Sequence, residues 1–174
     1  MADVTIRVLE LDDWEAYRAI RIRAVEMHTG YFLADPEETR QKPESFWKDN
    51  LDGDGKCVFG LFDGDAIVGL CGVFTWREDP SGKTGVMAMD YIDPEYRGRG
   101  YADLLYQARI DFALKHEPWD KLSICHREGN EPSKRAMIRH GFQFQGTCEI
   151  DWPDGTRDIE YQYEMDLVAK RKEA

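Results

Sequence analysis

The chain has 174 residues, of which 42% are hydrophobic and 33% charged, and this composition predicts one globular domain spanning residues 1–174. With 23 basic and 34 acidic residues, the net charge is −11, which argues against nucleic-acid binding because that depends on neutralising phosphates. The charge favours cationic partners such as amines. There is no apolar run of about 18 residues and no signal-peptide pattern, so we expect a cytoplasmic protein without membrane contact.

The four cysteines, Cys57, Cys71, Cys125 and Cys148, are scattered along the chain and include no Cys-x-x-Cys pair. This pattern indicates reduced thiols in the core of an intracellular protein. Cys125 is followed by His126, but no second pair of ligands lies nearby in the sequence, so we expect no metal site.

The first half of the chain predicts a strand, two helices and three further strands. Alternating β-forming residues begin at Val4, and Asp12 places an acidic side chain at the positive end of the helix that follows, which ends near Gly30. Gly69 and Gly72 within one strand indicate a bulge or bend. The expected ranges are 4–9 (strand), 12–30 (helix), 31–43 (loop), 43–50 (helix), 57–62 with 66–76 (hairpin) and 85–92 (strand).

The second half predicts a helix, a strand, a short helix and a final hairpin. Pro132 suits the first turn of the short helix, and Gly141 suits the left-handed residue that closes it. The expected ranges are 102–115 (helix), 122–126 (strand), 131–140 (helix) and 142–152 with 158–167 (hairpin), and the tail from 168 is expected to fray. This order indicates an α/β (α+β) fold, a mixed sheet of about seven strands flanked by about four helices.

A basic, glycine-rich loop joins the strand at 85–92 to the helix at 102–115. Gly98 and Gly100 permit positive φ and the close approach of another group. The N–H groups of a helix N-terminus, together with Arg97 and Arg99, form a site for an anion such as phosphate or pyrophosphate.

This loop carries the motif Arg-x-x-Gly-x-Ala, formed by Arg97, Gly100 and Ala102, which resembles the pyrophosphate loop of the GNAT acyltransferase superfamily. Further along, Asn130, a short helix and the pair at 141–142 resemble the second motif of that superfamily in order and spacing.

The opening segment 21–24, Arg-Ile-Arg-Ala, followed by Trp47, also resembles many small-molecule and N-terminal acetyltransferases. The resemblance is closest to the subgroup that acts on small molecules and on ribosomal-protein N-termini.

The resemblance implies a GNAT fold in which the strands at 85–92 and 122–126 splay apart and acetyl-CoA lies in the gap as a co-substrate. Pantetheine would pair with the first of these strands near Ile92 and contact Asn130, and the pyrophosphate would bind at 97–102. The implied cofactor-binding residues are Ile92, Arg97, Gly98, Arg99, Gly100, Tyr101, Ala102 and Asn130.

The expected catalytic residues are Ser133, Asp90 and His126, and each has an alternative role, because Met137 stands where many superfamily members have a proton-donating tyrosine. Ser133 could protonate the leaving thiolate, or serve only as a helix cap or first-turn residue. Asp90 could be a general base, or the partner in a structural ion pair. His126 could shuttle a proton, or be a satisfied core histidine.

We therefore expect an acetyl-CoA-dependent N-acetyltransferase whose acceptor is a small-molecule amine or a peptide N-terminus. The alternative is a non-catalytic domain that binds or senses acyl-CoA, which would need no acid or base. The hairpin at 148–167 could pair between two copies in a homodimer.

Overall fold

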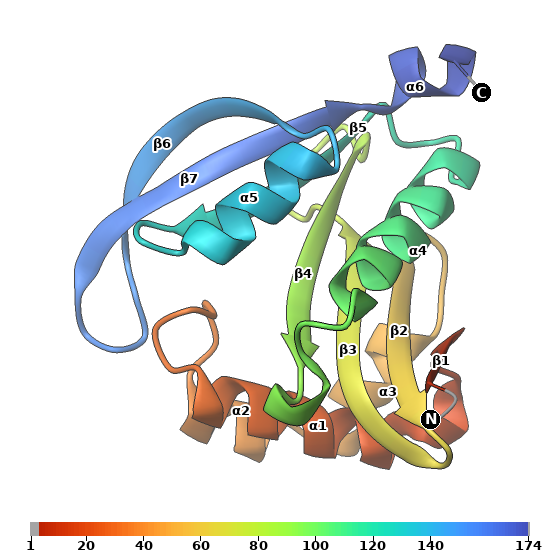
Figure 1. Ribbon diagram of the computed structural model, residues 1–174, viewed down its shortest axis with the longest axis vertical. Coiled ribbons are helices and arrows are strands. Elements are labelled where there is room, and N and C mark those ends of the chain that lie inside the picture. Colours follow the sequence, from red (N-terminus) through yellow and green to blue (C-terminus); the bar gives the residue numbers. More distant parts are fainter. Residues whose placement is uncertain (1–3, 174) are drawn as a thin grey trace.

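The computed structural model describes residues 4–173 and contains one seven-stranded sheet (Figure 1). The strand order is β1-β2-β3-β4-β5-β7-β6, and only the β4–β5 pair is parallel. The strands are β1 (Val4–Val8), β2 (Lys56–Asp63), β3 (Ala66–Thr75), β4 (Thr84–Ile92), β5 (Lys121–Arg127), β6 (Gln143–Asp151) and β7 (Arg157–Asp166). The expected mixed sheet of seven strands is confirmed.

Helices cover both faces of the sheet, with α1, α2 and α3 on one face and α4 and α5 on the other (Figure 1). The helices are α1 (Trp14–Met27), α2 (Pro36–Gln41), α3 (Glu44–Leu51), α4 (Tyr101–Lys115), α5 (Glu131–Arg139) and α6 (Leu167–Glu173). None of the helices within residues 4–173 has the length and apolar character needed to cross a bilayer.

Each helical layer buries its own cluster of apolar side chains. On α1, Tyr17, Ile20 and Ala24 recur at helical spacing and pack with Trp47 of α3 against the sheet. On the other face, Leu105 and the rest of the inner side of α4 pack into a larger cluster with α5. The two layers fix the directions from which a ligand can approach the sheet.

The central strands separate after a short parallel pairing. Only Thr84–Val86 of β4 pairs with Lys121–Ser123 of β5. Beyond these residues the facing edges of the two strands have no partner in the sheet, which confirms the splayed strands expected from the sequence.

Two bulges bend the strands. In the β2–β3 pairing the extra residue is Val68, next to Gly69, as the glycines of this strand indicated. The β3–β4 pairing also shifts register, and here Met89 on β4 takes φ = 64°, a left-handed conformation that is rare for a residue with a side chain. This second bulge lies where β4 leaves β5.

Two helices were not anticipated. The predicted loop at 31–43 contains α2, whose first turn is capped by Asp35 accepting a hydrogen bond from the Glu38 N–H at 2.9 Å. The tail, expected to fray, forms α6 up to Glu173. There Arg171 donates hydrogen bonds to four carbonyls at the end of α4 and just after it, a long-range contact that local sequence does not reveal.

The cysteine prediction was right in part. The described cysteines are all free, and Cys57 and Cys71 are buried in the core, but Cys125 is exposed and Cys148 is half-buried. Both lie on the face of β5 and β6 opposite to the one that packs with α5 in the core. Within residues 4–173 no cluster of histidine, cysteine and acidic side chains is suited to hold a metal ion.

Candidate active site

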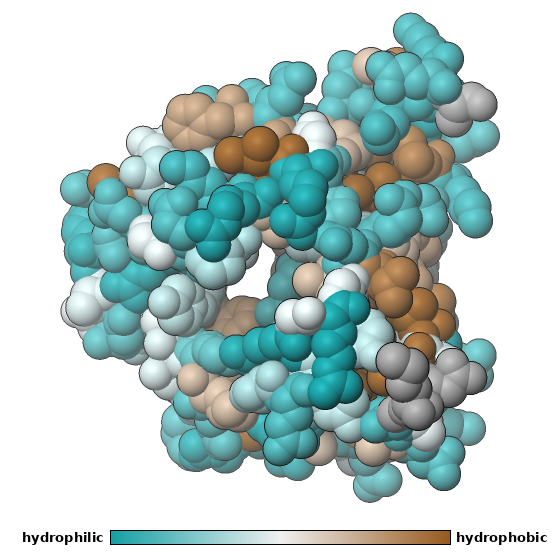
Figure 2. All heavy atoms as spheres, viewed as in Figure 1, coloured by the Kyte–Doolittle hydropathy of each residue, from teal (hydrophilic) through white to brown (hydrophobic). Residues whose placement is uncertain are grey.

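The gap between β4 and β5 forms the centre of the candidate site. The edge of β4 from 87 to 92 faces the edge of β5 from 124 to 127, and neither edge is paired with the other. Figure 2 shows an opening through the molecule at this place, bordered in Figure 1 by β4, α5, the β6–β7 hairpin and the loop between α1 and α2. Strand edges carry N–H and C=O groups that need partners, so this gap suits a ligand rich in amides.

At the end of β4 the basic loop leads into α4. Gly98 and Gly100 have φ values of 74° and 83°, and Gly100 is the N-cap residue of α4. Within the described residues, no backbone N–H from Gly98 to Ala102 has a hydrogen-bond partner. Five consecutive donors at the positive end of a 15-residue helix are therefore free to bind an anion.

The two arginines of the loop have different surroundings. Arg97 donates to the Ile92 carbonyl at 2.7 Å, and its Nη2 lies 2.8 Å from His28 Nε2 at the end of α1. Burial and then the Arg97 charge lower the pKa of His28. Arg99 lies over the Tyr96 ring and has no hydrogen-bond partner in the described part of the chain. Arg97 therefore anchors the loop, whereas Arg99 remains available to an anion.

Asp90 lies on the face of β4 that α4 covers, where it forms an ion pair with Arg109. Arg109 Nη1 donates to Asp90 Oδ2 at 2.7 Å, and Nη2 contacts the other oxygen. The Arg109 side chain is fully buried and its burial lowers the pKa, but the Asp90 carboxylate more than offsets this and raises it above the ordinary range. This arrangement is the ion pair weighed as the alternative to a base role for Asp90.

Helix α5 holds two of the expected residues at its first turn. Asn130 is the N-cap, and its side-chain oxygen accepts from the Ser133 N–H at 3.4 Å. Ser133 is therefore a first-turn residue and not the cap, and its hydroxyl makes no hydrogen bond with other described residues. Met137, one turn further, is buried in the core. The hydroxyl of Ser133 and the amide NH₂ of Asn130 are free for a ligand.

His126 belongs to β5, and its side chain is buried against β7. Its ring stacks on Tyr161 with the centroids 5.2 Å apart, and its Nδ1 lies 2.8 Å from the Arg127 carbonyl. Because a carbonyl only accepts, Nδ1 carries the proton and Nε2 accepts from the Tyr163 hydroxyl at 3.4 Å. Both ring nitrogens thus have partners, and a proton-shuttle role for His126 stays a prediction.

Glu160 on β7 was not singled out by the sequence, although strand alternation places it beside Cys125 and Arg127. It is 7% exposed, and no basic side chain of the described residues pairs with it; Gln162 donates to it at 3.2 Å. Cys125 is exposed, yet desolvation and then the Glu160 charge raise the pKa of its thiol. The strand register places Glu160 on the same face of the sheet as Cys125, opposite to the face that α4 and α5 cover.

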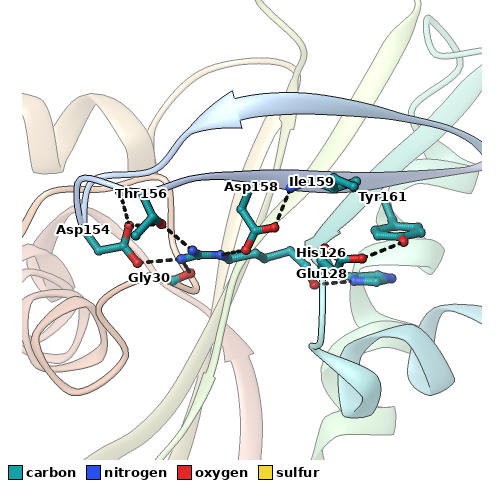
Figure 3. A network of polar contacts seen from close by, with 9 residues as sticks. Gly30, His126, Glu128, Asp154, Thr156, Asp158, Ile159 and Tyr161 are labelled. Atoms are coloured by element: carbon teal, nitrogen blue, oxygen red, sulfur yellow. Dashed lines mark hydrogen bonds and ion pairs between the residues drawn. The ribbon is translucent and has the colours of Figure 1, made fainter.

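Arg127, also missed, joins three segments of the chain through polar contacts, and its partners Gly30, Asp154 and Asp158 are labelled in Figure 3. It donates to the Gly30 carbonyl at 2.9 Å, to Asp154 at 2.6 Å and to Asp158 at 2.8 Å. The end of β5 is thereby tied both to the loop after α1 and to the β6–β7 turn. Contacts between segments so distant in the chain leave no local sequence signal.

Comparison with known proteins gives a family match. The model of the acetyltransferase (GNAT) domain matches residues 3–143. This chain belongs to the GNAT acetyltransferase family. The family predicted from the loop and the Asn130 motif is therefore confirmed, and the protein is an acetyltransferase. No curated protein sequence matches the chain at a significant level.

Solved structures share the fold of this GNAT domain at low sequence identity. An acetyltransferase of Streptococcus pneumoniae has a TM-score of 0.77 at 19% identity, with 94% of this chain and 99% of the other covered. Spermidine N-acetyltransferase from Vibrio cholerae, in complex with CoA and spermine, has a TM-score of 0.75 at 16% identity, covering 97% and 98%. Ribosomal-protein-S5-alanine acetyltransferase from Vibrio fischeri has a TM-score of 0.77 at 15% identity, covering 96% and 94%.

The geometry of this GNAT domain divides the expected residues into groups. The loop 97–102 and the end of β4 at Ile92 meet at one end of the gap, with Asn130 and Ser133 on the α5 side. Asp90 and His126 flank the same gap but are engaged with Arg109 and with tyrosines of β7.

Proposed function

We propose that this GNAT domain transfers the acetyl group of acetyl-CoA to a primary amine, either of a small molecule or of a peptide N-terminus. The observation that carries the proposal is the run of five unpartnered N–H groups at Gly98–Ala102, placed at the N-terminus of α4 beside the unpaired edge of β4. The five N–H donors can bind the oxygens of a pyrophosphate. The unpaired N–H and C=O groups of the β4 edge can form hydrogen bonds with the pantetheine amides.

The roles of the residues follow from these contacts. The loop N–H groups and Arg99 bind the pyrophosphate, while the β4 edge near Ile92 and the free amide of Asn130 hold the pantetheine. Backbone N–H groups of β4 at the Met89 bulge polarise the thioester carbonyl. We assign the Ser133 hydroxyl to the leaving sulfur, since it is free and Met137 has no proton to give.

The acceptor needs to lose a proton before it attacks. An alkylamine with a pKa of about 10.4 is only about 0.04% neutral at pH 7. The carboxylate of Glu160 lacks a basic partner among the described residues, whereas Asp90 and His126 remain candidates that are already hydrogen-bonded. We propose that the amine enters from the face of the sheet that carries Glu160, opposite α4 and α5.

Two of the structural neighbours support two kinds of acceptor. The structural neighbours include one enzyme bound to spermine and one that acts on a ribosomal-protein alanine, so amines of both kinds fit the fold. Pairing of two copies through the β6–β7 hairpin, whose β6 is an edge strand of the sheet, stays a prediction.

Titration calorimetry with acetyl-CoA, followed by a thiol-release assay over an amine library, tests this function. We expect acetyl-CoA to bind and at least one amine to release CoA thiol. Binding without thiol release for any amine would favour the non-catalytic acyl-CoA sensor, and absence of binding would overturn the proposal.

A further inference from the structure

Arg21 of α1 has no polar partner among the described residues. Its Nη1 is buried and unpaired, and neither Nε nor Nη2 donates to a protein atom. The two neighbouring arginines of the same helix differ: Arg18 donates to a backbone carbonyl, and Arg23 forms an ion pair with Asp93. The chain has 34 acidic residues, so the isolation of Arg21 does not reflect a shortage of partners.

The surroundings make this isolation costly. The guanidinium lies over the Phe32 ring, 4.6 Å from its centroid, and burial lowers the pKa of Arg21 to about 10. The Arg21 side chain is half-buried, and the cost falls on Nη1, a donor cut off from water without a hydrogen bond. Nε and Nη2 are not among the buried unpaired atoms and are the donors left for a ligand.

The position of Arg21 on α1 places it at the gap. It follows Tyr17 by one turn and precedes His28 by two turns, so the three side chains share a helix face. Tyr17 donates to the sulfur of Met89 at 3.4 Å, and the His28 ring lies 5.8 Å from that of Tyr91. Arg21 therefore lies on α1 between two residues that contact β4 beyond its pairing with β5, and its guanidinium lies over Phe32 of the loop that borders the gap.

We propose that Arg21 is an anion-binding subsite of the acceptor site, and that the acceptor is an amine that also carries a carboxylate, as a free amino acid does. Guanidinium Nε and Nη2 form a fork that binds both oxygens of a carboxylate. On the β7 side of the same sheet face, Glu160 is a buried carboxylate without a basic partner, and it complements the ammonium group. That this amine accepts an acetyl group rests on the proposed function.

The first test uses the unaltered protein. A panel of the L-amino acids and the matching L-amino-acid amides is titrated calorimetrically, with and without CoA. The amides keep the amine and the side chain but lack the carboxylate. The best amino acid should bind at least tenfold more tightly than its amide, about 1.4 kcal/mol. Equal or tighter binding of the amides would overturn the proposal in favour of a polyamine or peptide acceptor.

The second test compares Arg21→Met with Arg18→Met, which removes the same charge one turn away on the same helix. Arg21→Met should lose at least tenfold in amino-acid affinity and leave amide affinity within twofold, whereas Arg18→Met should change neither. Because a buried, unpaired N–H donor is removed, the unliganded Arg21→Met protein should also melt about 2 °C or more higher. If Arg21 only stabilised the fold, Arg21→Met would lower the melting temperature.

Arg21→Lys provides a variant that keeps the charge but loses the fork, and it should weaken amino-acid binding while retaining the fold. Equal weakening of amino acids and amides by these substitutions would overturn the subsite. Acetyl-CoA affinity, measured in parallel, separates the two proposals: amino-acid binding through Arg21 without any acetyl-CoA binding would retain the subsite and reject the proposed acetyl transfer.

Discussion

At the scale of single residues, Gly100 decides whether the loop can hold an anion. Its φ of 83° is favourable only for glycine, and a Cβ built there would meet no atom within 4 Å. We predict that Gly100→Ala weakens acetyl-CoA binding at least tenfold, about 1.4 kcal/mol, because the strained turn re-orients the free N–H groups. Calorimetry measures this.

Gly64→Ala is the matched control, since Gly64 also has positive φ and open space but lies in the β2–β3 turn. It should lose comparable stability and keep its acetyl-CoA affinity. A folded Gly100→Ala protein with the affinity of the unaltered chain would remove the loop from the binding site.

Ser133 is the residue whose hydroxyl remains free at the start of α5. We predict that Ser133→Ala lowers turnover about 100-fold, because the departing sulfur loses its proton donor, while acetyl-CoA affinity holds. Stability should change by less than about 0.5 kcal/mol, since Asn130 is the helix cap. Met137→Leu, measured alongside, should leave turnover unchanged. Full activity in Ser133→Ala would leave water as the proton source.

Asp90 has a structural partner, so its substitution acts on stability. We predict that Asp90→Asn lowers the unfolding free energy by about 2 kcal/mol, less than the roughly 3–5 typical of a fully buried pair, because the Asp90 side chain is 38% exposed. Denaturant unfolding measures the loss, and the double variant with Arg109→Met should recover most of it.

The same variant tests the expected base role of Asp90. In the unaltered enzyme, kcat should fall at low pH as the base becomes protonated. If Asp90→Asn no longer shows this fall in the pH profile of kcat per folded molecule, the base role is supported. A profile identical to that of the unaltered enzyme would assign Asp90 to the ion pair with Arg109 alone.

At the scale of elements, the Arg127 network joins β5, the loop after α1 and the β6–β7 turn. Within it, hydrogen bonds from Thr156 and then from Arg127 lower the pKa of Asp154 to about 2. A carboxyl group whose pKa is depressed by folding stabilises the native state above its unfolded pKa of about 3.9, and this contribution is lost as the pH falls towards 2.

We therefore predict that Asp154→Asn is less stable than the unaltered protein by a constant amount between pH 5 and 7, and that the difference shrinks from about pH 4 and disappears near pH 2. Chemical denaturation across pH measures it. Asp151→Asn, on an exposed side chain of the same hairpin, is the control and should show no such trend. A difference that grows on acidification would contradict the assigned network.

At the scale of the whole molecule, the net charge of −11 sets a repulsive background. We predict that the melting temperature rises between 0.01 and 0.15 M salt, because the Debye length shortens from about 30 to about 8 Å and screens that repulsion. Calorimetric scans measure it. Glu78→Lys, at an exposed position, changes the charge from −11 to −9 and should reduce the rise. A melting temperature that falls with salt would show that the ion pairs outweigh the repulsion.

The sequence alone determined the family, the seven-stranded sheet and the position of the glycine-rich loop before α4. These features are encoded locally: alternation predicts strands, and positive φ demands glycine at positions such as Gly98 and Gly100. It also indicated the splay, through the resemblance of the loop and of the Asn130 motif. Helix α2 was missed although Asp35 and Pro36 are a clear start signal.

The tertiary structure alone decided which charged groups are engaged and which are free. Asp90 is paired because α4 brings Arg109 against β4, and Arg127 is engaged because three distant segments meet at its guanidinium. Among the described residues, Arg21 Nη1 has no hydrogen-bond partner, and Glu160 has no ion-pair partner because Arg127, opposite it on β5, is engaged with Asp154 and Asp158. Pairing across space depends on distances that no local pattern of residues contains.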